Sequence, residues 1–137
     1  MLLSVLLVFA IWSKTAPAQT QQKPVDLAQK SAEAWLALTD SGKYSESWDQ
    51  ASTAFKAAVS QAKWVDMVAP VRSPLGKVIS RTLKNANYTK TLPGAPDGEY
   101  VVIQFSTSFE NKKESVETIT PMLDKDGKWR VSGYYIK

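Results

Sequence analysis

The sequence contains no cysteine and no histidine. These absences exclude disulfide bonds, thiol nucleophiles, histidine general bases, and metal sites built on cysteine or histidine ligands. The formal net charge is only +4, and the lysines and arginines are scattered among acidic residues. A nucleic-acid-binding domain is expected to gather its cationic side chains on one face. We therefore do not expect nucleic acid as a partner.

Large aromatic side chains, in contrast, are abundant. The 137 residues include five tryptophans and five tyrosines, and each of these side chains buries a large area when it packs. A chain of this length is sufficient for one domain with one modest core. The composition therefore predicts a single folded domain rather than a disordered chain.

The chain starts with an apolar run from Leu2 to Trp12. This run is too short to span a bilayer comfortably, but it has the length of the apolar region of a signal peptide. Ala16-Pro17-Ala18 follows it as an A-x-A cleavage site. We expect residues 1–18 to be a signal peptide and the mature protein to be periplasmic or secreted, with no stable membrane anchor. The alternative is an uncleaved segment that attaches the protein to the inner membrane.

The rest of the chain divides into a helical half and a strand-rich half. Residues 19–25 are polar and predict a disordered lead, so the domain is expected at 26–137. Helical spacing predicts a helix from Asp26 to Gly42, a short helix at 46–51, and a third that begins near Ser52 and is ended by prolines 70 and 74. Alternation and turn residues predict strands at 77–88, 99–110, 114–123 and 128–136.

Helices followed by strands indicate an α+β fold, in which the N-terminal helices pack on one face of a curved four-stranded antiparallel sheet. The Pro/Gly block at 92–98 is expected to reverse the chain between the first two strands. Pro121 suggests that the third strand lies at an edge or contains a bulge. The Asp-Gly pair at Asp126 and Gly127 predicts the last hairpin.

Several short motifs carry a family resemblance. They are, in order, Ala34-Trp35, Gly42-Lys43-Tyr44, Trp48, Leu92-Pro93-Gly94, Asp97-Gly98-Glu99-Tyr100-Val101, Glu117-Thr118-Ile119, Asp126-Gly127-Lys128-Trp129-Arg130-Val131 and Gly133-Tyr134-Tyr135. In this order the chain resembles the domain-of-unknown-function family 4019, which comprises small exported bacterial proteins. The resemblance implies a single exported domain with no established activity, so it transfers no catalytic residue. The element order is also similar to NTF2-like and cystatin-like folds, in which a pocket can open between helices and sheet.

Two charged residues interrupt apolar faces of the predicted strands. Arg81 lies between Ile79 and Leu83, and Glu117 shares a face with Ile119. If both faces look inward, the two long side chains can meet across the intervening strand. The pair would then be a polar anchor in a ligand pocket or, alternatively, a structural ion pair.

Aromatic residues supply the other candidate ligand-binding side chains. Trp35, Trp48 and Trp129 are the ones that we select to line an apolar pocket. The competing interpretation is that they form the core, because small domains rely on large side chains.

No residue pattern predicts a catalytic centre, a metal site or a cofactor. The segment from Asp124 to Gly127 is superficially similar to a calcium loop but lacks the twelve-residue ligand pattern. The carboxylates that we considered as acids or bases, Glu33, Asp49 and Asp66, do not stand in apolar surroundings. We therefore expect no cofactor and no bound metal.

The sequence favours a non-catalytic binding domain for a small apolar ligand or for an envelope protein. One alternative is an isomerase- or dehydratase-like enzyme that uses a buried Asp/Tyr pair. Another is a structural module that forms a homodimer through an exposed sheet face. The polar residues Gln104, Ser106 and Ser108 on the expected outer face argue against that last hypothesis.

Overall fold

The computed structural model describes residues 17–137, so the apolar run and Ala16, the first residue of the predicted cleavage site, lie outside the described residues. Helices come first and strands follow, which confirms the predicted α+β fold. The helical elements are α1 (Pro17–Asp40), α2 (Tyr44–Asp49), α3 (Thr53–Ala58), α4 (Gln61–Arg72) and the 3-10 turn η1 (Ser73–Leu75). The strands are β1 (Val78–Thr89), β2 (Tyr100–Phe109), β3 (Lys112–Leu123) and β4 (Trp129–Ile136).

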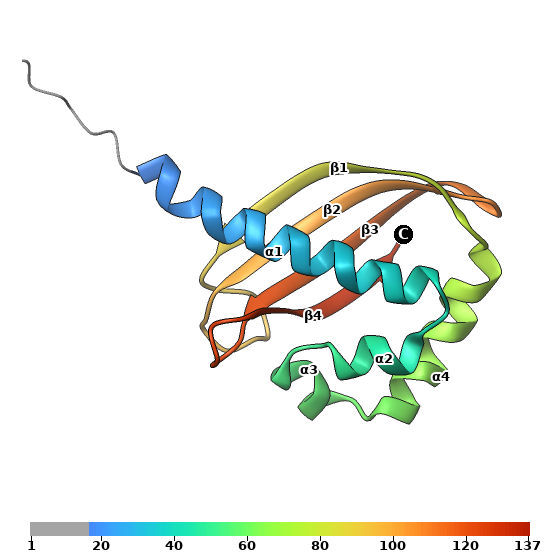
Figure 1. Cartoon of the computed structure of the whole chain (residues 1–137), viewed down its shortest axis with the longest axis horizontal. Helices are drawn as coiled ribbons and strands as arrows, with labels where there is room; N and C mark the ends of the chain where they lie inside the picture. Colours follow the sequence, from blue (N-terminus) through green and yellow to red (C-terminus); the bar gives the residue numbers. More distant parts are fainter. Residues whose placement is uncertain (1–16) are drawn as a thin grey trace, which may run out of the picture.

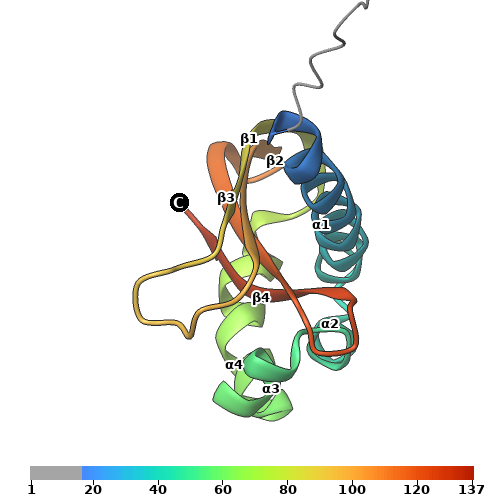
Figure 2. The ribbon, with the colours of Figure 1, turned by 90° about the vertical axis from the view of Figure 1, so that its left-hand side faces the viewer.

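The four strands form one antiparallel meander in the order β1-β2-β3-β4. The long helix α1 crosses one face of this sheet, and α2, α3 and α4 gather beyond the β4 side (Figure 1). The view turned by 90° shows the same arrangement, with β4 between α1 and the α3–α4 pair (Figure 2). The strand order leaves β1 and β4 as the two edges of the sheet.

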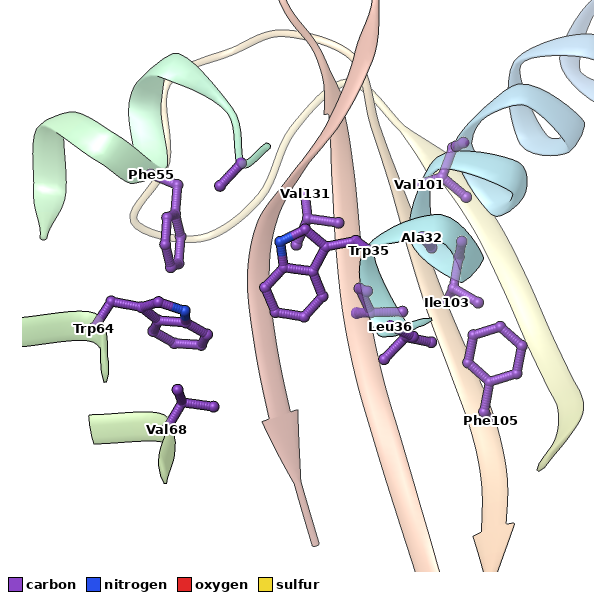
Figure 3. Close-up of a cluster of buried hydrophobic side chains, with 13 residues drawn as sticks. Ala32, Trp35, Leu36, Phe55, Trp64, Val68, Val101, Ile103, Phe105 and Val131 are labelled. Carbon is purple, nitrogen blue, oxygen red and sulfur yellow. The ribbon is translucent and has the colours of Figure 1, made fainter. Parts of the chain in front are cut away.

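The core lies between α1, α4 and the inner face of the sheet. Figure 3 shows Trp35 at its centre, between Val131 of β4 and Trp64 of α4. The Trp35 ring lies 5.9 Å from the Trp64 ring and 5.2 Å from the Tyr134 ring, centroid to centroid. Phe55 meets Trp64 edge to face at 5.0 Å. Such aromatic contacts add to the stabilisation from apolar burial.

Two boundaries at the helical end differ from the prediction. Residues 19–25, expected to be unstructured, form the first turns of α1, which begins at Pro17. Asp26, the expected first residue of the helix, instead lies inside α1, where its carboxylate accepts a hydrogen bond from Gln22 at 2.9 Å. This i,i+4 contact stabilises the helix on both sides of Pro24.

The predicted third helix is in fact two helices, α3 and α4. Ser60 separates them because its hydroxyl accepts a hydrogen bond from the Lys63 amide and so caps a new helix. The new helix directs Trp64 and Val68 into the core. Pro70 does not end the helix, because α4 continues to Arg72.

Pro121 lies at a bulge, as predicted, but β3 is an interior strand rather than an edge. Its register partner is Val131, and the register shifts by one residue between Thr120 and Pro121. A proline has no amide hydrogen to give to a ladder, and the shift accommodates that loss.

Candidate functional site

A cluster of charged side chains lies between the C-terminal ends of α1 and α4 and the inner face of the sheet. Glu117 of β3 is fully buried, and Arg81 of β1 reaches it across β2. The Arg81 Nε atom lies 2.7 Å from Glu117 Oε1, and Nη2 lies 3.2 Å from Oε2. The predicted contact between these two residues is therefore confirmed. Whether the pair binds a ligand stays a prediction.

Two further residues, from the helices, extend this ion pair into a network. Asp40, at the end of α1, receives hydrogen bonds from Arg81 Nη1 at 2.7 Å and Nη2 at 3.0 Å. The same carboxylate accepts a bond of 3.2 Å from Nη2 of Arg72, at the end of α4. Burial alone would lower the pKa of Arg81, but hydrogen bonds and ion pairs with Asp40 and Glu117 raise it. The guanidinium therefore stays charged between its two carboxylates.

Glu117 also receives two hydroxyl hydrogen bonds. Thr107 of β2 donates to its Oε1 atom at 2.5 Å, and Tyr134 of β4 donates to its Oε2 atom. Burial and then the Glu117 charge raise the pKa of Tyr134. The phenol therefore keeps its proton and acts as a donor. With Arg81, Thr107 and Tyr134 in place, both oxygens of Glu117 are occupied.

The resulting charged cluster consists of Asp40, Arg72, Arg81, Thr107, Glu117 and Tyr134. Its two guanidinium groups balance its two carboxylates, so the cluster has no net charge. A buried network of this kind contributes little stability over an apolar replacement, but removing one partner is costly. The arrangement can position neighbouring groups and offer hydrogen bonds to a neutral ligand.

Arg72 is the member of the cluster with unused hydrogen-bonding capacity. It is only 3% exposed, and its guanidinium lies over the Phe109 ring at 4.7 Å. Its Nη1 atom donates to the Gly76 carbonyl at 2.6 Å, and Nη2 donates to Asp40. Among the described residues, the buried Nε–H has no acceptor. A buried donor without a partner is unusual in folded proteins and costs free energy.

Arg72 and Tyr134 also line a groove between α4 and β4, with a volume of about 260 Å³. We call this the α4–β4 groove. Its lining is predominantly apolar and comprises Trp64, Met67, Val68, Val71, Arg72, Tyr134, Tyr135 and Ile136. Three of these side chains, Met67, Val71 and Tyr135, are more than half exposed. Exposed apolar side chains that meet at a groove are typical of a binding surface.

A second groove, of about 470 Å³, lies where α1, α2 and the start of β4 meet. Two of the predicted ligand-binding residues, Trp35 and Trp129, contribute to its wall. Trp35 is mainly a core residue, since it is 2% exposed and its Nε1 donates to the Ser47 carbonyl at 2.7 Å. Trp129 is half-buried, and its carbonyl accepts a 2.7 Å bond from Ser31 of α1. The rim of this groove is charged, with Glu46, Lys128 and Arg130.

Trp48, the third predicted aromatic ligand residue, lies in neither groove. Its Nε1 atom donates to the Val59 carbonyl at 2.8 Å, and the Lys56 ammonium lies 5.8 Å from its ring centroid. These contacts tie α2 to α3 and to Val59, which follows α3. The structure thus does not bring the three selected tryptophans together at one site.

Sequence reasoning missed four members of the charged cluster: Asp40, Arg72, Thr107 and Tyr134. For Arg72 a signal was available, because it follows Trp64 and Val68 at helical spacing on the buried face of α4. Thr107 stands on the inward face that alternation predicts for β2. Asp40 and Tyr134 gave no local signal, since their neighbours in the charged cluster come from other elements.

Within the described part of the chain, no helix has both the length and the apolar character needed to cross a membrane. Acidic side chains in that same part also form no group of three or more that could hold a metal ion.

The fold and the cluster define a small α+β domain with a polar centre and an apolar groove beside its sheet edge. A family model described as protein of unknown function (DUF4019) matches residues 31–134, which include every residue of the charged cluster. The chain belongs to this family. No protein among those with curated descriptions matches the sequence.

Proposed function

We propose that the protein is a non-catalytic binding domain that holds an apolar group of its ligand in the α4–β4 groove. The observation that supports this proposal is the groove itself, which exposed Met67, Val71 and Tyr135 line together with buried Arg72 and half-buried Tyr134. Predominantly apolar walls with a few polar groups are the usual lining of a ligand site. The walls would bind by burial of apolar surface, and the polar groups would orient the ligand.

The hydrogen bonds of the buried carboxylate support binding over acid–base chemistry. An acid–base mechanism would need a buried acid beside a tyrosine, and in this structure that pair is Glu117 with Tyr134. Glu117 accepts hydrogen bonds from Arg81, Thr107 and Tyr134 on its two oxygens. A general base needs an oxygen within reach of the substrate proton. In this pair, both oxygens are directed at the protein's own donors.

The test uses N-phenyl-1-naphthylamine, an uncharged dye whose fluorescence rises in apolar surroundings. Val71, on the groove rim, and Ile79, on β1, are exposed to similar extents, at 54% and 60%. We expect Val71→Glu to weaken dye binding by about tenfold or more, because a charge beside the groove is costly to desolvate. Ile79→Glu is the matched control and should leave binding unchanged. Equal binding by the two variants would refute the groove as the site.

We also propose that the protein is exported, on the basis of the signal-peptide features in residues 1–18. Fractionation of a bacterial host that expresses the full chain, followed by N-terminal sequencing, tests this. A soluble periplasmic or secreted product that starts at Gln19 is the expected result. A membrane-bound product that still contains residues 1–18 would instead support the uncleaved attachment.

A further inference from the structure

We propose that the ligand of the α4–β4 groove is an uncharged, extended peptide segment of a partner protein, which adds to the second half of β4 as a fifth strand. This inference rests on the proposed function, since it names the kind of ligand that the groove takes. It goes further by assigning the backbone of β4 as part of the site.

The sheet register shows which backbone groups of β4 point away from the sheet. Lys137 exchanges both backbone hydrogen bonds with Val116 of β3, at 2.9 and 3.0 Å. Two residues earlier, Tyr135 is the register partner of Thr118. In an antiparallel ladder, alternate residues direct their N–H and C=O groups to the same neighbour. The residues between, Tyr134 and Ile136, therefore direct theirs to the open side.

The first half of β4 differs, because helical elements occupy its open side. The Trp129 carbonyl accepts the hydroxyl of Ser31 at 2.7 Å, and the Val131 carbonyl accepts the amide of Ser52 at 2.8 Å. Within residues 17–137, no strand pairs with β4 on this side, and no such contact reaches Tyr134 or Ile136. An exposed strand edge of this kind is a template for an added strand.

The same two residues line the α4–β4 groove, so an added strand would lie along it. Side chains of a strand alternate between its two faces. One apolar side chain of the added strand would enter the groove between Met67 and Val71 on α4 and Tyr134 on β4. Main-chain hydrogen bonds would then provide affinity, and the groove would select the side chain.

The charges of the cluster favour an uncharged ligand. Arg72 and Arg81 are already balanced by Asp40 and Glu117, so a carboxylate placed here would have no spare cation. The buried Nε–H of Arg72 still lacks an acceptor within the described residues, and a peptide carbonyl supplies a neutral one. These features favour an internal peptide segment over a fatty acid or a peptide C-terminus.

The experiment uses two synthetic heptapeptides of the same sequence, acetyl-Thr-Val-Thr-Leu-Thr-Val-Thr-amide. One has a normal backbone, and the other is N-methylated at alternate residues on the hydrogen-bonding side. Titration is followed by the backbone amide NMR signals of Tyr134 and Ile136. We expect both signals to shift with the first peptide and the methylated peptide to bind at least about tenfold more weakly, because it cannot complete the ladder.

The second test changes the protein instead of the peptide and removes the backbone N–H of Ile136. Ile136→Pro removes an N–H that faces away from β3, so we expect the fold to persist and peptide binding to fall about tenfold. Ile136→Val keeps the N–H and is the matched control.

Two results would overturn the inference. In the first, the dye binds in the groove but the two peptides bind equally or not at all; the proposed function then stands and the strand addition fails. In the second, sedimentation velocity shows a dimer that Ile136→Pro dissociates and that the peptide does not, which identifies a second copy as the occupant. If Val71→Glu leaves dye binding unchanged, the proposed function fails as well.

Discussion

The two edges of the sheet expose apolar side chains to a similar degree, but their backbones differ. On β1, Ile79 and Leu83 are 60% and 43% exposed, while Tyr135 on β4 is 53% exposed. The β1 edge contains two register shifts, and Arg81 and Lys84 add charge to the strand. Irregular and charged edges resist the pairing of another strand. The second half of β4 has neither feature, so the regular backbone rather than apolar exposure distinguishes the candidate binding edge.

The difference extends to what each edge strand does for the core. β1 contributes Arg81, which links Asp40 and Glu117 and so binds the strand to α1 and β3. β4 contributes Tyr134, a neutral donor to Glu117 that also lines the α4–β4 groove. The β1 edge thus links the carboxylates of the charged cluster to one another, and the β4 edge connects the cluster to the α4–β4 groove.

The strongest expected effect comes from removing the β1 contribution. Arg81→Leu leaves Glu117 buried without its counter-ion, and we expect a loss of about 3–5 kcal/mol in the free energy of unfolding. Urea denaturation followed by tryptophan fluorescence measures this. The double variant Arg81→Met with Glu117→Met removes both charges and should recover most of the loss. Unchanged stability of Arg81→Leu would contradict a structural role for this pair.

A smaller effect is expected at the closed half of β4. Ser31→Ala removes the hydroxyl that reaches the Trp129 carbonyl, and we expect a loss of about 1 kcal/mol. Ser41→Ala is the matched control, because its exposed hydroxyl bonds only to Ala37 within its own stretch of chain. The same denaturation assay compares the two variants. If both lose stability equally, Ser31 does not secure this half of the edge.

The smallest effect concerns the turn that leads into β4. Hydrogen bonds from Arg130 and from the Lys128 amide lower the pKa of Asp126 from 3.8 to about 2. A lowered carboxyl pKa means that the contact is present above pH 4 or so and is lost as the pH falls through about 2. NMR titration of the Asp126 carboxyl carbon should show this midpoint. In Arg130→Gln the midpoint should return toward the ordinary value, and no change would exclude the ion pair in solution.

The sequence was sufficient for the fold class because its signals are local. Strand alternation around Ile103, the turn at Gly127 and the helical spacing around Trp35 each report on a few neighbouring residues. Arg81 and Glu117 could be paired because each stood out against an apolar face. The break between α3 and α4 was not predicted, because it depends on one residue, Ser60, whose hydroxyl caps the second helix.

The remainder of the site depends on tertiary packing that a single sequence does not encode locally. Asp40 and Tyr134 meet through Glu117 and Arg81, although they belong to the first helix and the last strand. The α4–β4 groove exists because α3 and α4 separate and the second half of β4 remains open. Neither feature produces a periodic pattern in the amino-acid sequence.

The hydrogen bond between Ser31 and the Trp129 carbonyl joins residues that are 98 positions apart. The strands pair only with their sequence neighbours, so the hairpins can form as soon as their residues are available. Helix α1, however, packs on β4, and the first helix must therefore wait for the last strand. Folding of the core therefore requires all four strands, because α1 completes its packing only when β4 is in place. A chain that lacks β4 should not form a stable core and should be cleaved rapidly by proteases.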